Sequence, residues 1–283
     1  MSWQLYTALC VTTLSVAVLL QRVILHRYKV DGPAFAVVFQ FLVALAMLPA
    51  VLTHGFDFSG FYNMLMPIIV SGLAFGVGSV TYAQALRKVD ASAFSVLFAS
   101  HAVWVMLFGV VFLSERLDWL HLLGTGVIFL SIGLLVKDVR YLKPGSGFVY
   151  ALFTGLLYGV AIASASYVGR HTDVLTWSLV SFVLGGLSSL LVSPKALRKA
   201  RTVFTKRTLV VLLTCVVLYG LGNIAMMFAY KYGPFTLVAP LRQTGIILTT
   251  LLAVLFLRDE RTDIVRKILA AITCTAGVVL LVS

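Results

Sequence analysis

Charged residues are scarce in this chain, and their scarcity excludes a soluble domain. Lys, Arg, Asp and Glu together make up 11 % of the 283 residues, whereas hydrophobic residues make up 60 %. A soluble globular domain has about 25 % charged residues. Apolar stretches of spanning length recur along the whole chain, as a helical bundle requires when backbone groups cannot be left unpaired in lipid. The sequence therefore predicts an all-α, multi-pass integral membrane protein, which we expect in the plasma (inner) membrane.

Carboxylates are absent from the interiors of the apolar stretches. All ten acids fall in predicted loops or at helix ends: Asp31, Asp57, Asp90, Glu115, Asp118, Asp138, Asp173, Asp259, Glu260 and Asp263. A proton-coupled exporter of cationic drugs is expected to carry a buried acid, and carboxylate catalysis or a carboxylate–histidine metal site needs one too. No nucleophile elbow, phosphate loop or dinucleotide fingerprint is present. We therefore expect neither an enzyme nor a bound cofactor or metal.

Cysteine is also rare. The three cysteines, Cys10, Cys215 and Cys274, lie inside apolar stretches without metal-ligand spacing. Buried thiols of this kind pack like small hydrophobic residues, so they carry no functional information. The first residues lack the basic segment of a signal peptide, and we interpret residue 3 onward as the first retained helix.

Glycine, proline and charge divide the apolar sequence into ten predicted transmembrane helices. Their predicted ranges are 3–24, 33–53, 62–86, 91–113, 118–137, 147–169, 174–193, 208–230, 234–257 and 263–282. Asp31 to Pro33 precede the second helix, Pro144 and Gly145 precede the sixth, and Pro194 follows the seventh. Most connections are short, so sequential neighbours are expected to be antiparallel.

The chain matches itself at a shift of 144 residues without gaps. The identical pairs are Tyr6/Tyr150, Val16/Val160, Ala17/Ala161, Gly76/Gly220, Gly78/Gly222, Ala85/Ala229, Leu97/Leu241, Leu107/Leu251, Val110/Val254, Phe112/Phe256, Leu113/Leu257 and Gly133/Gly277. A single register that aligns four of the five helices predicts two repeats, residues 1–143 and 144–283, within one membrane domain. An odd number of spans in each repeat makes the second copy enter the membrane from the opposite side, which is the inverted-repeat plan of secondary transporters.

The distribution of Lys and Arg agrees with inverted repeats. Apart from Arg242, all of them except Arg116, Arg170 and Lys231 fall in loops on one predicted face of the membrane. That face is expected to be cytoplasmic, which places both termini on the other side. The net charge of +12 then reflects topology and attraction to anionic lipid, and we expect no nucleic-acid partner.

Arg242 lies about a third of the way into the predicted helix 234–257. At about 1.5 Å per residue it is roughly 12 Å from the start of that helix, too deep for easy snorkelling. A cation at such depth costs about 2.5 to 3.5 kcal/mol on insertion scales, so it normally faces protein or a wet cavity. Arg242 either recognises an anionic group of a substrate or is satisfied by backbone carbonyls, and the adjacent Pro240, which frees a carbonyl, favours the first interpretation.

Other polar side chains in the predicted helices are candidates to line a shared cavity with Arg242. The candidate substrate-binding residues are Arg242, Gln243, His101, Tyr82, Gln40, Asn223 and Tyr158. His101 lies one helical turn past the repeat equivalent of Arg242, so both could face one cavity. For His101 a packing role remains open, as it does for transmembrane tyrosines and glutamines that make interhelical contacts.

Two matching segments carry a resemblance to a known family. They are Tyr82 to Leu117, YAQALRKVDASAFSVLFASHAVWVMLFGVVFLSERL, and Phe228 to Arg261, FAYKYGPFTLVAPLRQTGIILTTLLAVLFLRDER. Each has an alanine at the end of a third helix, small residues after a short turn, and an apolar fourth helix that ends in Phe-Leu followed by an acid. With these features the chain resembles the drug/metabolite transporter superfamily, specifically its EamA-like ten-helix branch.

The resemblance implies a carrier for a small polar or amphipathic metabolite, such as an amino acid, purine, sugar or organic anion. The central cavity would be lined by the first four helices of each unit, and a monomer would be competent because one chain supplies both units. The family's usual cytoplasmic termini are opposite to those that the charges predict. A different class remains open, a non-transporting membrane scaffold or accessory subunit of a lipid-modifying complex in which Arg242 makes only interhelical contacts.

Overall fold

The computed structural model is helical throughout the part of the chain that it describes. It describes residues 2–104, 107, 119–135, 146–232, 238, 241–242, 244–257 and 263–282. Within these ranges there is no β-strand. The prediction of an all-α protein is therefore confirmed for the described residues.

The helices follow the predicted order closely. They are α1 Trp3–Arg22, α2 Gly32–His54, α3 Leu65–Lys88, α4 Ala91–Phe98, α6 Trp119–Leu135, α7 Gly147–His171, α8 Val174–Val192, α9 Lys206–Tyr232, α11 Gly245–Phe256 and α12 Ile264–Val282. Three short elements accompany them: a π-helix, Val23–Arg27, and two 3₁₀ segments, Tyr62–Met64 and Pro194–Thr202.

Length and composition make six described segments suitable for crossing a membrane. These segments are Trp3–Arg27, Gly32–His54, Tyr62–Lys88, Gly147–Gly169, Val174–Val192 and Lys206–Ala229. Shorter apolar helices cover Ala91–Trp104, Trp119–Leu134 and Gly245–Phe256. The protein is thus a multi-pass membrane protein.

Local chemistry explains where several helices begin. The Asp31 carboxylate accepts a hydrogen bond from the Ala34 backbone N–H at 3.2 Å, and Pro33 occupies the first turn, where its missing N–H costs nothing. Asp173 caps α8 in the same way, at 2.7 Å from the Thr176 nitrogen. Each oxygen satisfies one of the unpaired amide groups at a helix N-terminus.

The fourth predicted helix, 91–113, is wrong as one unbroken helix. The structure ends α4 at Phe98, forms a turn at Ala99 and Ser100, and resumes helical backbone at 101–104. In the turn the Ser100 N–H donates to the Leu97 carbonyl, three residues earlier, at 3.2 Å. An α-helical bond would reach back four residues, so the backbone is wound more tightly here. Neither glycine nor proline marks this break.

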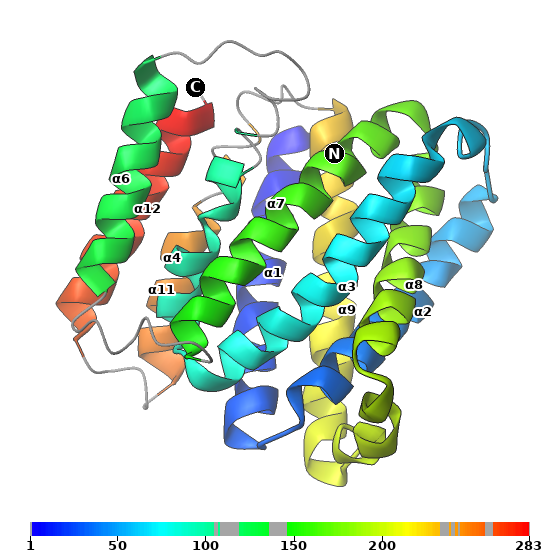
Figure 1. Cartoon of the computed structure of the whole chain (residues 1–283), viewed down its shortest axis with the longest axis horizontal. Coiled ribbons are helices and arrows are strands. Elements are labelled where there is room, and N and C mark those ends of the chain that lie inside the picture. Colours follow the sequence, from blue (N-terminus) through cyan, green and yellow to red (C-terminus); the bar gives the residue numbers. More distant parts are fainter. Residues whose placement is uncertain are drawn as a thin grey trace.

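Helices from the two halves of the sequence alternate in space. In Figure 1 α1 and α9 run through the middle, α6 and α12 lie side by side at one edge, and α2 and α8 lie toward the other. Helix α3 packs against both α7 and α8. The largest buried cluster joins residues of α1, α2, α3, α4, α9 and α12, so the centre of the bundle is built from both halves.

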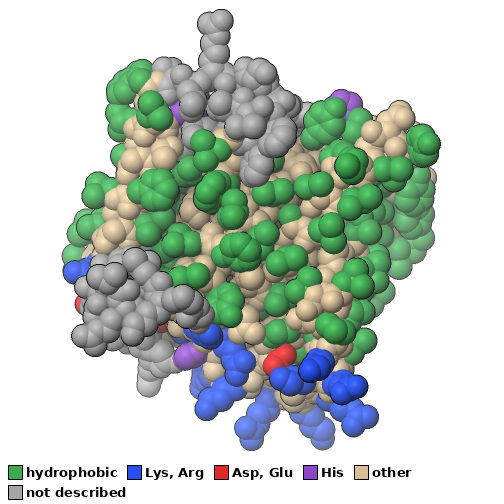
Figure 2. Space-filling view, in the orientation of Figure 1, with side chains coloured by type: hydrophobic (Ala, Val, Ile, Leu, Met, Phe, Trp, Pro, Cys, Tyr) green, Lys and Arg blue, Asp and Glu red, His purple; other side chains and the backbone are tan. Residues whose placement is uncertain are grey.

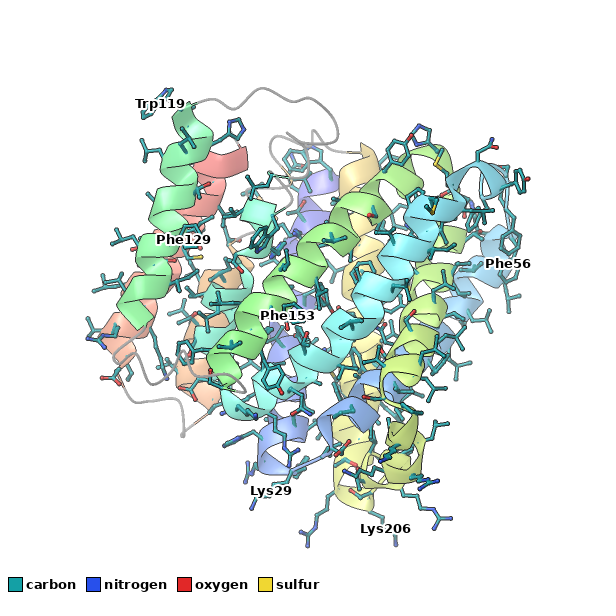
Figure 3. The ribbon with its side chains drawn as sticks, viewed as in Figure 1. Lys29, Phe56, Trp119, Phe129, Phe153 and Lys206 are labelled. Atoms are coloured by element: carbon teal, nitrogen blue, oxygen red, sulfur yellow. The ribbon has the colours of Figure 1, made fainter. Side chains whose placement is uncertain are left out.

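Positive charge gathers at one end of the bundle. Figure 2 shows Lys and Arg side chains at that end and hydrophobic side chains over the middle. Lys29 and Lys206 project from it, whereas Trp119 lies at the opposite end (Figure 3). Both chain ends lie toward that opposite end (Figure 1).

Candidate functional site

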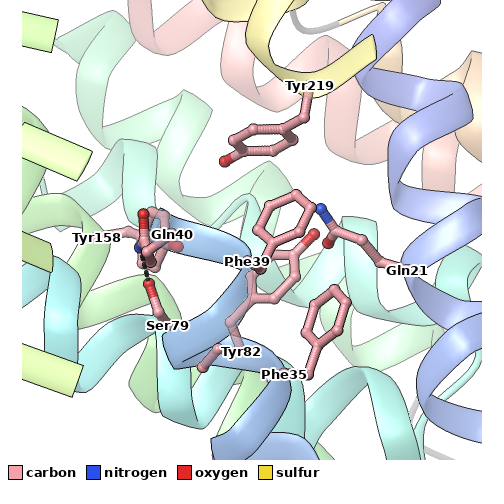
Figure 4. Close-up of a pocket in the computed structure, with 9 residues that line it drawn as sticks. Gln21, Phe35, Phe39, Gln40, Ser79, Tyr82, Tyr158 and Tyr219 are labelled. Carbon is pink, nitrogen blue, oxygen red and sulfur yellow. Dashed lines mark hydrogen bonds between the residues drawn. The ribbon is translucent and has the colours of Figure 1, made fainter. Parts of the chain in front are cut away.

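A small cavity lies among α1, α2, α3, α7 and α9, the central helices of the bundle. Its walls come from nine residues: Gln21, Phe35, Ala36, Phe39, Gln40, Ser79, Tyr82, Tyr158 and Tyr219. Figure 4 shows Gln40, Ser79 and Tyr158 on one side, Gln21 on the other, and Tyr82 and Phe39 between them. The cavity measures about 20 Å³, which is space for roughly one water.

Gln40 is buried, and its hydrogen bonds determine which way its amide points. The Ser79 hydroxyl donates its single proton to the Phe75 carbonyl at 2.7 Å. It can therefore only accept from Gln40, whose Nε2 contacts it (Figure 4). Gln40 Oε1 is left buried without a hydrogen-bond partner.

Gln21 is the second buried glutamine of the wall, on α1. Its side chain is 1 % exposed. It lies near the Cys215 thiol of α9, which donates to the Ala17 carbonyl at 3.4 Å. Gln21 Oε1 is buried and has no hydrogen-bond partner either.

Aromatic rings form the rest of the cavity wall. Tyr82 and Tyr158 have ring centroids 6.1 Å apart, Phe39 meets Tyr219 edge-on at 5.1 Å, and Phe35 stacks on Phe39 at 5.0 Å. Aromatic pairs at these separations stabilise each other beyond the area they bury. The wall is therefore flat-faced and apolar, with polar atoms at its edges.

The interrupted fourth helix connects His101 to this wall. The Phe98 ring lies 5.1 Å from Tyr158 and 4.7 Å from His101, centroid to centroid. His101 Nδ1 lies 2.8 Å from the Phe98 carbonyl. A carbonyl can only accept, so Nδ1 carries the proton and Nε2 of the neutral ring is an acceptor.

Arg242 lies near the same region, in helical backbone just before the turn at Thr244 that precedes α11. Its Nη1 contacts the Met226 sulfur at 3.3 Å, and its Nε is buried without a hydrogen-bond partner. The guanidinium is within electrostatic reach of His101 and Tyr219. Among the residues that the structure describes, Arg242 belongs to no ion pair.

The helix breaks beside His101 and Arg242 occur at equivalent positions of the two repeats. The Ser100 N–H donates to the Leu97 carbonyl at 3.2 Å, and the Thr244 N–H donates to the Leu241 carbonyl at 3.1 Å. Both pairs are separated by the 144-residue shift. Tightened turns inside transmembrane helices expose backbone groups and are tolerated where protein or a cavity satisfies them.

The structure brings together three of the seven predicted site residues at the cavity, Gln40, Tyr82 and Tyr158. Asn223 lies one helical turn from Tyr219, and its amide donates to the Tyr219 carbonyl at 2.8 Å. His101 and Arg242 lie close to the wall as described above, and Gln243 lies outside the described residues.

Sequence reasoning missed several wall residues, chiefly Gln21, Ser79 and Tyr219. Gln21 adjoins Arg22, which marked it as a helix end. Ser79 lies one turn before Tyr82, and Phe35 and Phe39 lie one turn apart beside Gln40, so helical spacing from the predicted residues could have found them.

Ion pairs close the basic end of the bundle near the cavity. Asp90 accepts from Lys267 of α12 at 2.5 Å and lies 3.5 Å from Arg22 of α1. Arg22 also donates to the Leu86 carbonyl at 2.6 Å. Both cationic side chains are buried, and Arg22 directly follows the wall residue Gln21.

The opposite end carries a smaller polar cluster. Asp173 pairs with His54 at 3.3 Å in addition to capping α8. Burial by itself would raise the pKa of Asp173, but hydrogen bonds from the Thr176 backbone and hydroxyl, together with His54, outweigh it and lower the pKa. At exposed Asp57, hydrogen bonds with Ser59 lower the pKa of the carboxyl.

Comparison with known proteins adds the family context. Residues 1–137 and 145–283 each match the model of the EamA-like transporter family. A curated relative from a Sinorhizobium species, named an uncharacterized transporter in the cobO 3′ region, is 38 % identical over 72 residues. That match covers 25 % of this chain and 50 % of the relative, so the chain spans about half the length of the curated relative it matches.

One solved structure shares the fold over nearly the full length. It is titled only as the crystal structure of a protein, and it superposes with a TM-score of 0.61 at 16 % identity, covering 98 % of this chain and 94 % of the other. At this identity the likeness concerns the fold alone.

Proposed function

The chain belongs to the EamA-like transporter family, and we propose that it is a secondary carrier that moves a small polar or amphipathic metabolite by alternating access through the central cavity. Membership of a transporter family favours a non-enzymatic membrane transporter of the drug/metabolite type. The substrate class and the mechanism are the parts proposed here.

The observation that carries the proposal is the cavity at the centre of the apolar bundle, whose wall includes buried polar side chains. Five helices from both halves of the chain converge on two buried glutamines and three tyrosines. Leaving a buried acceptor unpaired costs about 1 to 3 kcal/mol. Polar groups held at that cost inside a membrane bundle are expected to serve a ligand.

We further propose ten transmembrane helices in two inverted repeats, residues 1–143 and 144–283. The double family match supports this division. Helix contacts also support it, since exchanging the repeats converts α1·α9 into α3·α7 and α3·α8 into α2·α9, and all of these pairs touch. Equivalent breaks near Ser100 and Thr244 agree with the broken helices of inverted-repeat transporters.

Within this carrier, Arg242 would bind a carboxylate, phosphate or other electron-rich group of the substrate. The guanidinium has donors to spare, because its Nε is unpartnered and its described contact at Nη1 is a weak sulfur acceptor. Gln243, His101, Tyr82, Gln40, Asn223 and Tyr158 would complete the site by hydrogen bonding or ring contact. Since one chain provides all walls of the cavity, we propose that a monomer is competent.

The charged end is proposed to face the cytoplasm. The gathering of Lys and Arg at the end opposite to both termini (Figures 1 and 2) supports this orientation. A reporter fused to either terminus should then be active outside the cytoplasm, and a cytoplasmic signal would contradict it.

A ligand screen tests the site and the carrier function together. Purified protein would be heated with amino acids, nucleobases, organic acids, sugar phosphates and cationic dyes, because a ligand at 100 times its dissociation constant stabilises by about 2.7 kcal/mol. We expect one anionic or zwitterionic class to stabilise wild type and the control Lys29→Ala, but not Arg242→Ala or Arg242→Gln. If no class stabilises a well-folded protein, the scaffold alternative gains; if Arg242→Ala binds as wild type does, the site is wrong.

A further inference from the structure

Two glutamines that line the cavity, Gln21 and Gln40, each have a buried amide oxygen without a hydrogen-bond partner. Gln21 and Gln40 are 1 % and 6 % exposed. The orientation of the Gln40 amide follows from Ser79, whose proton is already donated to Phe75. The cavity wall therefore holds two amide oxygens that can still accept hydrogen bonds from an occupant once the walls part.

The surfaces between these acceptors are flat rings. Phe35, Phe39, Tyr82, Tyr158 and Tyr219 account for five of the nine wall residues. Ring faces of this kind bind planar groups by stacking, as they do nucleobases on single-stranded nucleic-acid binding proteins. A planar occupant would lie against the rings with its edge toward an amide oxygen.

Charge selects against a cationic occupant. Carbonyl oxygens and aromatic faces also suit an ammonium group, but none of the nine wall residues is a carboxylate. The nearby charge is that of Arg242, which reaches Tyr219 electrostatically and would repel a cation. The cavity thus favours a neutral or anionic group.

We propose that Gln21 and Gln40 are specificity-determining residues of the carrier and accept hydrogen bonds from the N–H groups of a flat, uncharged nitrogen heterocycle, either the whole substrate or its ring portion. This inference rests on the proposed carrier function and names the substrate class of the same site. In the present conformation the cavity holds about one water, so the walls must part to admit a ring, as alternating access requires.

Paired ligands that differ only in N–H groups test the inference. The probes are uracil against 1,3-dimethyluracil and xanthine against its 1,3,7-trimethyl derivative, with phenyltrimethylammonium as the cationic ring. Binding would be measured by stabilisation in detergent and by competition for uptake into proteoliposomes. We expect at least one N–H ring to bind about tenfold or more tightly than its methylated partner, which corresponds to about 1.4 kcal/mol.

Replacing each glutamine with methionine, an unbranched apolar residue of similar size, tests whether the preference for N–H rings comes from these two side chains. Gln21→Met and Gln40→Met should reduce the N–H preference to about twofold or less, because the acceptors are gone while side-chain volume is kept. Gln84→Met is the matched control, a glutamine on α3 that packs near Gly32 and is not a wall residue, and it should keep the full preference. Wild-type melting temperatures without ligand would show that each variant folds.

Three results would overturn the inference while leaving the carrier intact. One is equal binding of methylated and unmethylated rings, the second is preference for the cation, and the third is an N–H preference that survives both glutamine variants. Binding of an aliphatic anion alone, lost in Arg242→Ala, would also refute the ring class but support the carrier. Absence of binding by every class, rings included, would instead count against the proposed function itself.

Discussion

At the scale of single residues, hydrogen bonds to individual oxygen atoms determine where helices begin and how side chains of the cavity wall are oriented. Ser79 on α3 illustrates this. Because its hydroxyl donates to Phe75, it can only accept from Gln40, and one proton determines the direction of an amide on the neighbouring helix α2. The sequence does not show which group a hydroxyl donates to, and in the sequence Ser79 is one small residue among many on α3. The predicted residues Gln40, Tyr82 and Tyr158 were found because polar atoms in a membrane span are rare, whereas their orientation depends on neighbours from other helices.

Asp173 provides a residue-scale prediction outside the membrane. Replacing it with Ala removes the cap of α8 and should lower the free energy of unfolding by about 1 kcal/mol at pH 7. Its folded-state pKa is lowered, so the stabilisation from its charge is present above the unfolded-chain value of about 3.9 and is lost as pH falls through the folded-state value. Unfolding in mixed micelles at pH 7 and pH 3 measures both.

Asp173→Asn is the control for this prediction, because the amide oxygen can still cap α8 while the charge is gone. It should retain most of the free energy of unfolding at pH 7, and this free energy should fall less between pH 7 and pH 3 than in the wild type. An Ala variant that is equally destabilised at both pH values would contradict the charge contribution.

At the scale of elements, close helix contacts depend on glycines. At Gly76 an added Cβ would lie 2.2 Å from the Ser188 Cβ and 2.8 Å from the backbone of α8, and the Ser189 hydroxyl donates to the Gly76 carbonyl at 2.9 Å. Helix α8 therefore lies directly on α3. A small residue in a transmembrane helix permits close approach, but the sequence does not identify the partner helix.

Gly76→Ala should therefore destabilise the protein by about 1 to 3 kcal/mol, since α3 and α8 must separate. Gly126→Ala on α6 is the matched control, because nothing lies within 4 Å of its added Cβ and alanine favours a helix by up to about 1 kcal/mol over glycine. Unfolding free energies of the two variants test this. Equal effects would show that the α3–α8 contact is not tight.

The ion pairs at the basic end join α1, α4 and α12, and they predict a second element-scale effect. Asp90→Asn removes the carboxylate charge that pairs with the buried side chains of Arg22 and Lys267, which are 6 % and 7 % exposed. Breaking such a buried pair is expected to cost about 3 kcal/mol. Stability in detergent at low salt measures the loss.

The exposed pair Lys199–Asp31, 3.0 Å apart with the lysine 59 % exposed, serves as its comparison. Lys199→Ala should cost less than about 1 kcal/mol. If Asp90→Asn is as mild as Lys199→Ala, the cluster does not hold these helices together.

The broken helices define the limit of sequence reasoning at this scale. Pro240 pointed to a bend beside Arg242, but the turn at Ala99 and Ser100 has neither proline nor glycine. There α7 comes so close that an added Cβ on Gly155 would lie 2.2 Å from the Ser100 hydroxyl oxygen. A tertiary contact therefore accompanies this break, and only the 144-residue register connects it to its counterpart at Thr244.

At the scale of the whole molecule, most of the predicted architecture came from the apolar composition and from the internal match at a shift of 144 residues. Apart from the fourth and ninth helices, apolar length and punctuation located the described helices to within a few residues, because the membrane permits few alternatives to a helix. The charge distribution along the loops predicted one basic end, and the structure has one (Figure 2). Which helices surround the cavity could not be predicted, because Gln21 and Tyr219 lie far apart in the chain and meet only through packing.

Access to the cavity from both ends is the most direct test of the central claim, that substrate passes through it by alternating access. The wall residue Ser79 would be replaced by cysteine, after Cys10, Cys215 and Cys274 are replaced and transport is verified. Ser71→Cys on the same helix is the control, because Ser71 is fully buried and is not a wall residue. Membrane-impermeant thiol reagents would be applied from either side of oriented vesicles. The account predicts that Ser79→Cys is labelled from both sides, that substrate shifts the ratio, and that Ser71→Cys is not labelled. A transporting protein in which Ser79→Cys reacts from neither side, or from one side only in every condition, would contradict it.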